Sequence, residues 1–223
     1  MAGSAEPPAC VAPVVGIGEG AHAGRGVVPR RPTHGLRSPP IDRRDHLRQL
    51  LAAFSPADDL ERSYLRRFGE LLSVPGDPFA RAHFVPGHVT ASSFVLSPTG
   101  DDVLLIEHSK LHRWLQPGGH VDPEDVDVLA AARREVVEEV GLAELSLVHE
   151  GVFDLDVHDI PPLKGDPGHA HFDVRFLFRA PTRDVRAGSD AKAARWVPLD
   201  EVRLDASDES VMRAVRKLKR RIR

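Results

Sequence analysis

The sequence is nearly free of cysteine, with Cys10 as the only one among 223 residues. A single thiol excludes a disulfide within the chain and a zinc site built from several cysteines, and it is typical of a reducing compartment. We therefore expect a cytoplasmic protein. Cys10 also lies in a segment with the composition of an unstructured tail, which argues against a nucleophilic thiol.

Long hydrophobic runs are missing as well. Residues 103–106 are typical of the longest runs, whereas a transmembrane helix needs about 20 apolar residues. Residues 1–30 lack the basic start and the unbroken apolar stretch of a secretory signal peptide. The sequence thus predicts a soluble protein with no membrane partner.

An excess of charge of one sign is also lacking, since 30 Lys and Arg residues stand against 33 Asp and Glu residues, for a net charge of -3. This balance provides no overall attraction to nucleic acid. Basic residues near the C-terminus lie at the end of an expected helix without interleaved aromatic residues, so we interpret them as solvated cations and expect no nucleic-acid partner. They are Arg213, Arg216, Lys217, Lys219 and Arg220.

The composition is otherwise that of a globular protein. Hydrophobic residues make up 41% and charged residues 28%, and the length suits one domain with an appendage. Residues 1–40 are rich in Gly, Pro and Ala, which predicts a disordered leader. We expect a helical N-terminal extension at 41–78 and the main domain at 79–223.

The extension is predicted to contain two helices. Apolar residues recur every three or four positions in both, and Ser55 with Pro56 is typical of an N-cap followed by the first residue of the second helix. The apolar face of that helix, with Leu60, Tyr64 and Phe68, would permit a homodimer.

The main domain alternates strand and helix patterns. Two strand patterns joined by a turn at 97–100 predict a hairpin. Gly141 is a typical C-cap for a helix that ends at residue 140. The expected strands lie at 89–96, 103–107, 145–155, 169–179 and 194–197, with helices at 127–140 and at the C-terminus, where Val211, Val215, Leu218 and Ile222 form an apolar stripe. This order of elements predicts an α/β (α+β) protein.

The helix at 127–140 carries a cluster of carboxylates. Glu135, Glu138 and Glu139 fall within an arc of roughly 100° on one face, because positions i, i+3 and i+4 are neighbours on a helix. Such like charges repel unless a cation joins them, and carboxylate oxygens select a hard ion, Mg2+ or Mn2+. A solvated helix face is the alternative interpretation. The preceding Gly118 and Gly119, which allow a backbone to approach a ligand, favour a site.

The stretch Arg134–Leu142 resembles the second half of the signature of the Nudix hydrolases at every defined position. The resemblance extends over about residues 88–200. It implies a Nudix fold, with a mixed β-sheet sandwiched between helices, and metal binding by the three glutamates. It also implies that Arg134 supports the glutamate cluster and the loop, and that the two glycines shape the loop.

The first half of the signature departs from the family. Counted back from Arg134, the leading glutamate falls on Val126 and the glycine on His120, so the loop after Gly119 is one residue longer. Asp125 and Asp127 are the candidates to replace the missing glutamate.

The resemblance implies hydrolysis of a diphosphate bond in a nucleoside diphosphate linked to a second group. Metal ions neutralise phosphate charge and lower the pKa of bound water, and a carboxylate then completes its activation. Glu135 or Glu139 would be the base. The alternative is a Nudix-like sensor that binds a nucleotide without turnover, although such sensors commonly lose glutamates that are all present here.

Further candidates lie outside the signature. His169, His171, Asp173 and Arg175 alternate with apolar residues, so a strand would place all four on one face, either toward the site or toward solvent. We take His171 and Asp173 as substrate contacts.

Between a strand and the glycine loop, Lys110 and Arg113 could bind phosphate, or could be surface charges beside a buried Trp114. His120 follows the glycines and would either contact phosphate or orient the loop.

Overall fold

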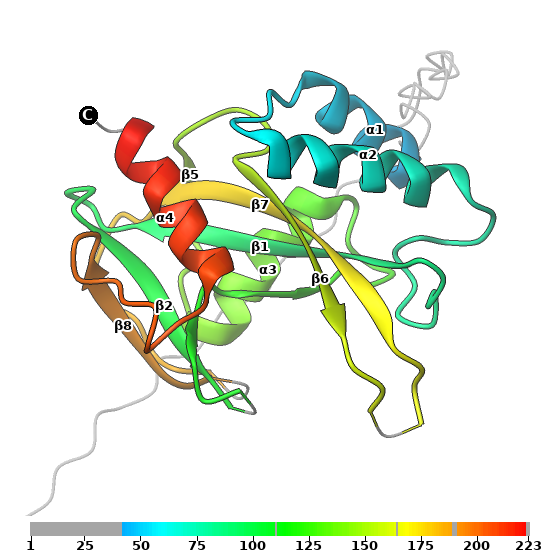
Figure 1. Ribbon diagram of the computed structural model, residues 1–223. Coiled ribbons are helices and arrows are strands. Elements are labelled where there is room, and N and C mark those ends of the chain that lie inside the picture. Colours follow the sequence, from blue (N-terminus) through cyan, green and yellow to red (C-terminus); the bar gives the residue numbers. More distant parts are fainter. Residues whose placement is uncertain (1–41, 110, 164, 189–190, 222–223) are drawn as a thin grey trace, which may run out of the picture. The chain divides into compact units, whose positions relative to one another are not determined.

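The computed structural model describes residues 42–109, 111–163, 165–188 and 191–221. The predicted leader with Cys10, as well as Lys110 and Ile222, lies outside these residues. In chain order the elements are α1 (Arg43–Ala53), α2 (Asp59–Ser73), β1 (Gly87–Leu96), β2 (Asp102–His108), β3 (Trp114–Leu115), β4 (Gly118–His120), α3 (Val128–Val140), β5 (Ser146–Leu147), β6 (Asp154–Ile160), β7 (His169–Arg179), β8 (Ala191–Pro198) and α4 (Glu209–Arg221) (Figure 1). None of the described helices is long and apolar enough to cross a membrane.

The strands form one mixed sheet around β1 and β7. These two strands pair in parallel from Gly87 opposite Ala170 to Leu96 opposite Arg179. All other pairings are antiparallel: β4 and β2 pair with β1, β5 and β6 pair with β7, and β3 and β8 pair with β2. The predicted hairpin of β1 and β2 is confirmed by the pairing of Leu96 with Val103.

The prediction of a single strand at 145–155 is wrong. β5 and β6 both pair with β7, but residues 148–153 between them leave the regular ladder. Gly151 in this interruption has a φ of 87°, a left-handed conformation that strands do not use. Phe153, which contributed to the strand pattern, is instead buried in a core cluster with residues of α4.

The second helix begins later than predicted. Its N-cap is Asp58, whose carboxylate accepts a hydrogen bond from the backbone N–H of Glu61 at 2.8 Å. The Glu61 carboxylate accepts in turn from the N–H of Ala57 at 2.6 Å, so two donors at the helix start are satisfied. Ser55 and Pro56 lie before this cap, and the prediction of Ser55 as the N-cap is therefore wrong.

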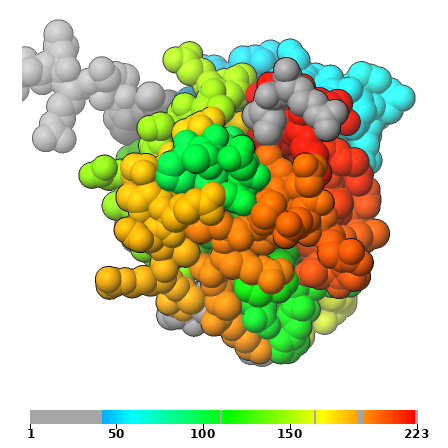
Figure 2. Space-filling model, turned by 90° about the vertical axis from the view of Figure 1, so that its left-hand side faces the viewer, coloured from blue at the N-terminus to red at the C-terminus, as the bar shows by residue number. Residues whose placement is uncertain are grey.

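Helices cover both faces of the sheet (Figure 1). The N-terminal helices and α3 pack on the face that carries Val89 and Phe172, and α4 packs on the opposite face, with Phe94 and Leu177. Viewed from the side, the residues of α4 also lie beside those of β8 and the loop that follows it (Figure 2). The mixed sheet between helices that the sequence predicts is confirmed.

The N-terminal helices share the main hydrophobic core. Phe68 of α2 meets Phe172 of β7 edge to face, with ring centroids 5.3 Å apart, and it is fully buried. Of the three residues considered for a dimer surface, Leu60 is exposed and Tyr64 is half-buried. Phe68 lies in the core of its own chain and is not available to a second copy.

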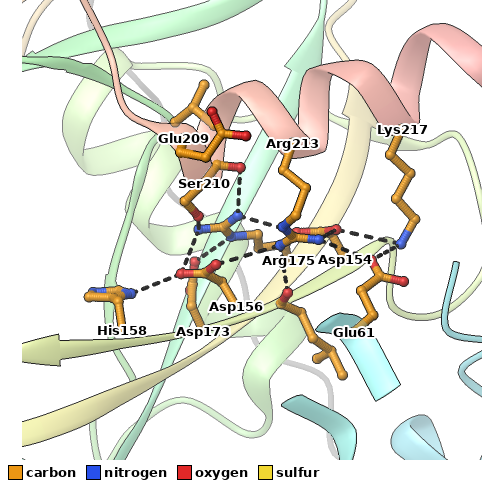
Figure 3. Close-up of polar contacts among 12 residues, drawn as sticks. Glu61, Asp154, Asp156, His158, Asp173, Arg175, Glu209, Ser210, Arg213 and Lys217 are labelled. Carbon is orange, nitrogen blue, oxygen red and sulfur yellow. Dashed lines mark hydrogen bonds and ion pairs between the residues drawn. The ribbon is translucent and has the colours of Figure 1, made fainter. Parts of the chain in front are cut away.

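A buried ion network joins α2, β6, β7 and α4 (Figure 3). Arg213 donates to both carboxylate oxygens of Asp154, at 2.8 and 2.7 Å, and Lys217 pairs with Glu61. The interpretation of the basic residues of α4 as solvated cations is therefore wrong for Arg213 and Lys217, which are 9% and 6% exposed. The network consists of Glu61, Asp154, Asp156, Asp173, Arg175, Arg213 and Lys217.

Candidate functional site

The carboxylate helix forms as the sequence predicts. Asp127 caps α3 by accepting a hydrogen bond from the backbone N–H of Ala130 at 2.7 Å, and Gly141 ends the helix with a φ of 74°. Val136 and Val140 are buried against the sheet. This packing fixes the rotation of the helix, so the glutamate face is directed toward β4.

The glutamates of α3 lie against the glycines of β4. Glu139 is buried, and its Oε2 accepts a hydrogen bond from the backbone N–H of Gly118 at 3.0 Å. Glu135 lies beside Gly119, where an added Cβ would stand 2.5 Å from Glu135 Oε1. Glu138 is exposed. A Cβ on Gly118 would lie 2.3 Å from that of Ser92. Neither position therefore has room for a side chain.

Arg134 holds the glutamate cluster and the loop together. Its guanidinium donates to Asp125 at 2.9 Å, to Glu135 at 2.9 Å, to Glu138 at 3.1 Å and to the carbonyl of His120 at 2.9 Å. The hydrogen bonds to Asp125, followed by the one to Glu135, raise the pKa of Arg134. The arginine thus remains a cation among several carboxylates.

Asp125, one of the two candidates to replace the missing leading glutamate, contacts both Arg134 and the loop. It is buried, it pairs with Arg134, and it accepts a hydrogen bond from the backbone N–H of Asp122 at 2.8 Å. Asp127, the other candidate, is the helix cap. Val126, on which the family's leading glutamate falls when counted back from Arg134, is 72% exposed and makes no such contact.

The donor set of α3 suits a hard divalent cation. Burial raises the pKa of Glu135, and the neighbouring Glu138 adds to this effect, while Arg134 acts in the opposite direction. A nearby cation would favour the charged form of this carboxylate, which burial disfavours. The absence of a side chain at Gly119 also leaves the approach to Glu135 open. Glu135, Glu138 and Glu139 therefore fit Mg2+ or Mn2+ better than a softer metal.

Helix α1 braces the loop before α3. Arg43 donates to the carbonyl of Asp122 at 2.9 Å and to that of Asp125 at 3.4 Å. His46 Nδ1 lies 3.4 Å from the carboxylate of Asp127. The sequence does not predict these contacts, because about 80 residues separate the partners and no local pattern indicates them.

The residues predicted to contact substrate occupy different environments. Arg113 is exposed and donates to the carbonyl of Ser207 at 2.8 Å, in the turn before α4. Asp173 belongs to the buried ion network, where it accepts from Ser92 Oγ at 2.7 Å and from Arg175 Nε at 2.8 Å. The structure does not bring these two residues together with the glutamates as one set.

His120 and His171 lie in a separate group of imidazoles, with their ring centroids 5.2 Å apart. Burial lowers the pKa of His120 to about 4, and the nearby Arg81 acts in the same direction. A neutral imidazole is a weak ligand for phosphate. Because the His120 carbonyl also accepts from Arg134, the residue orients the loop.

Sequence reasoning did not find a cavity of about 400 Å³ between α2, β6 and α4. Arg213, Arg216 and Arg220 contribute to its lining together with Tyr64 and His158. The spacing of these arginines places them on one face of a helix, and this was the available signal. Arg213 and Arg216 pair with Asp154 and Glu209, and Asp58 and Asp156 also line the cavity, so its positive charge is largely balanced within the chain.

Comparisons with known proteins place these features in context. The family model described as NUDIX domain matches residues 86–217, more than half of the chain. A similar solved structure is the binary complex of the C. elegans Ap4A hydrolase, with 24% identity, coverage of 60% of this chain and 96% of that chain, and a TM-score of 0.47. The MutT protein from Methanosarcina mazei has 17% identity, coverage of 60% and 94%, and a TM-score of 0.47. No curated protein matches the chain.

Proposed function

Because the chain belongs to the Nudix family, as the match over residues 86–217 shows, we propose that it hydrolyses a diphosphate bond in a nucleoside diphosphate linked to a second group, or in a related diphosphate, with Mg2+ as cofactor. One observation carries this proposal: Glu135 and Glu139 of α3 lie against Gly119 and Gly118, and Arg134 joins Glu135 and the exposed Glu138 to the loop. We further propose that the reaction takes place in the cytoplasm.

Each residue of this site has a defined task. Glu135, Glu138 and Glu139 would hold the cation, which when bound neutralises phosphate charge and acidifies a water molecule. Arg134 and Asp125 fix the loop so that the backbone of β4 stays beside the carboxylates. Glu135 or Glu139 accepts the proton of the attacking water.

We place the substrate's phosphates at the glycine loop. His120 orients this loop, and Arg113 and Lys110 are the proposed cationic contacts from the segment between β2 and β3. Lys110 lies outside the described residues, so its contribution rests on the sequence alone.

The test is product release from a panel of nucleoside triphosphates, dinucleotides, nucleotide sugars and non-nucleotide diphosphates, with and without Mg2+. We expect Mg2+-dependent turnover of at least one class and its loss in Glu139→Gln, because the amide keeps the shape but removes the charge that the cation needs. Glu144→Gln is the matched control, since Glu144 is an exposed glutamate just beyond α3. If a panel member instead raised the melting temperature without being cleaved, the chain would be a binding module.

A second variant tests the geometry rather than the charge. In Gly119→Ala the added Cβ would displace Glu135, and a shift of about 1 Å costs on the order of 100-fold in rate. Gly69→Ala in α2 is the control, because nothing lies within 4 Å of its new Cβ. Equal activity of the two variants would contradict the assigned site.

A further inference from the structure

Five histidines gather on one face of the sheet. His88 of β1 pairs in register with His171 of β7, and His171 pairs with His158 of β6. His120 of β4 stands opposite Thr90, two positions beyond His88, and His169 stands two positions before His171. Residues paired in register, or two apart along a strand, share a face of a sheet. The pairing of four strands thus brings together side chains that are up to 83 residues apart in sequence.

Three of these imidazoles converge closely. The ring centroid of His88 lies 4.9 Å from that of His169 and 4.7 Å from that of His171. One nitrogen from each of the three rings lies within 4.8 Å of the others. Nitrogens that share a tetrahedral zinc ion at about 2.0–2.1 Å are roughly 3.4 Å apart, so the remaining difference is small enough for side-chain rotation to close.

His88 lacks the partners that a buried imidazole normally has. It is 2% exposed, and neither of its ring nitrogens makes a hydrogen bond of normal geometry with any residue that the structure describes. Buried polar atoms without a partner are rare in folded proteins and call for an explanation. A metal bond would satisfy one of these nitrogens.

Burial favours the neutral form of two of the three rings, His88 and His171. Burial lowers the pKa of His88 to about 4 and that of His171 to about 2, and the adjacent histidines act in the same direction. Neutral imidazoles have the free lone pair that a metal requires. His158 differs, since its Nδ1 lies 3.0 Å from the Asp156 carboxylate, and it is not among the three residues whose nitrogens converge.

We propose that His88, His169 and His171 form a binding site for a transition-metal ion of borderline softness, with Zn2+ as the expected occupant. Three imidazoles are a known ligand set for zinc, and they leave its fourth position open. His169 and His171 are only half-buried, which gives water or an anionic oxygen access to that position.

This site is distinct from the carboxylate cluster. Gly119 faces Glu135 on the α3 side of β4, whereas the ring of the next residue, His120, lies 5.1 Å from that of His88 on the opposite side. The two sites also differ in chemistry, because carboxylate oxygens favour Mg2+ and imidazole nitrogens favour zinc. The proposal therefore stands independently of the hydrolase activity.

The experiment is a calorimetric titration of the full, chelator-treated chain with Zn2+ in the presence of excess Mg2+, which occupies the glutamates. Co2+ absorption in the visible range then reports the ligand geometry. We expect one zinc ion per chain, and a loss of affinity of more than about 100-fold in His169→Gln and in His171→Gln, since even outer-shell changes cost 10–100-fold. His169 is half-buried, so its variant should fold.

Two matched controls separate the alternatives. His149→Gln removes an imidazole from the loop between β5 and β6, and Glu138→Gln weakens the carboxylate site; both should bind zinc like the wild type. Zinc should also raise the melting temperature of the wild type but not that of His169→Gln. The proposal is overturned if the wild type binds no zinc, if the histidine variants retain it, or if Glu138→Gln loses it.

Discussion

One face of β7 carries two kinds of polar residue, and their surroundings differ sharply. His169 and His171, the first half of this four-residue polar face, are surrounded by other imidazoles. Asp173 and Arg175, its second half, pair with opposite charges. The second half is covered by α4, which brings Arg213 to Asp154 on the neighbouring strand. A polar strand face is therefore not one environment, because the element packed against it decides how charge is balanced.

Burial of ionisable side chains is compensated differently in the two halves. Burial alone would raise the pKa of Asp154 and Asp156, but Arg175 holds both below their ordinary values, so the carboxylates stay charged and paired. Burial instead favours the neutral form of His171 and of the neighbouring His88. Charged groups suit a rigid joint between elements, and neutral imidazoles suit ligand binding.

The largest effect is expected when the ion network loses Arg175, its central cation. Arg175→Met would leave Asp154, Asp156 and Asp173 short of their shared partner, and we expect a loss of about 3–5 kcal/mol in the free energy of unfolding, measured with urea. Arg203→Met is the control, because Arg203 pairs with Asp205 on the surface. Similar effects of the two variants would contradict the role given to the network.

The second largest effect is expected from acid, which should destabilise the fold through the buried histidines. The pKa of His88 is lowered from 6.5 to about 4 in the folded chain, so between these values the unfolded chain binds more protons. Protonation of His88 in the unfolded chain therefore lowers the free energy of unfolding. The free energy has its full value above pH 6.5 and falls by up to about 3 kcal/mol as the pH decreases toward 4.

Unfolding of metal-free protein at several pH values measures this loss. The groups that act on His88 in this range are Arg81, His83, His120, His169 and His171. His120→Gln should reduce the slope between pH 6.5 and 4, since the pKa of His120 is also about 4. An unchanged slope would show that these imidazoles do not titrate in the way described.

A smaller effect should follow from the contribution of α2 to the charged half. Glu61 is fully buried and pairs with Lys217 and Arg213 of α4. Glu61→Gln keeps an acceptor for the N–H of Ala57 but removes the charge, so we expect a loss of about 1–2 kcal/mol in unfolding experiments. Glu70→Gln, at an exposed position of the same helix, should change little.

The smallest effect is expected at the boundary between the two halves. His158 contacts Asp156 on one side and His171 on the other, and its side chain is 46% exposed. His158→Gln should cost no more than about 0.5 kcal/mol, as for other partly exposed pairs. Calorimetry should also give wild-type zinc affinity, and a strong loss would add His158 to the ligand set.

Local patterns in the sequence were sufficient for several elements. The bounds of α3 and its end at Gly141 depend on residues within a few positions of one another, although the cap at Asp127 was not predicted. The same holds for the hairpin turn between β1 and β2. The family resemblance, confirmed by the matched domain, also rests on a continuous stretch of residues.

Other contacts could not be predicted from the sequence, because the two partners are distant in the chain. Lys217 was interpreted as solvated, whereas its partner Glu61 lies 156 residues away. The brace from Arg43 to the loop before α3 spans about 80 residues. No periodicity within one helix reports such a contact.

The sequence by itself determined the carboxylate face of α3 and the shared face of His169, His171, Asp173 and Arg175, since the helical and strand periods set these two. It also placed the two glycines directly before that helix. Only the tertiary structure decided that Asp125 pairs with Arg134 while Asp127 caps α3, and that the polar face of β7 divides into an ion network and a histidine group. The physical reason is that charge balance and burial depend on which elements pack together.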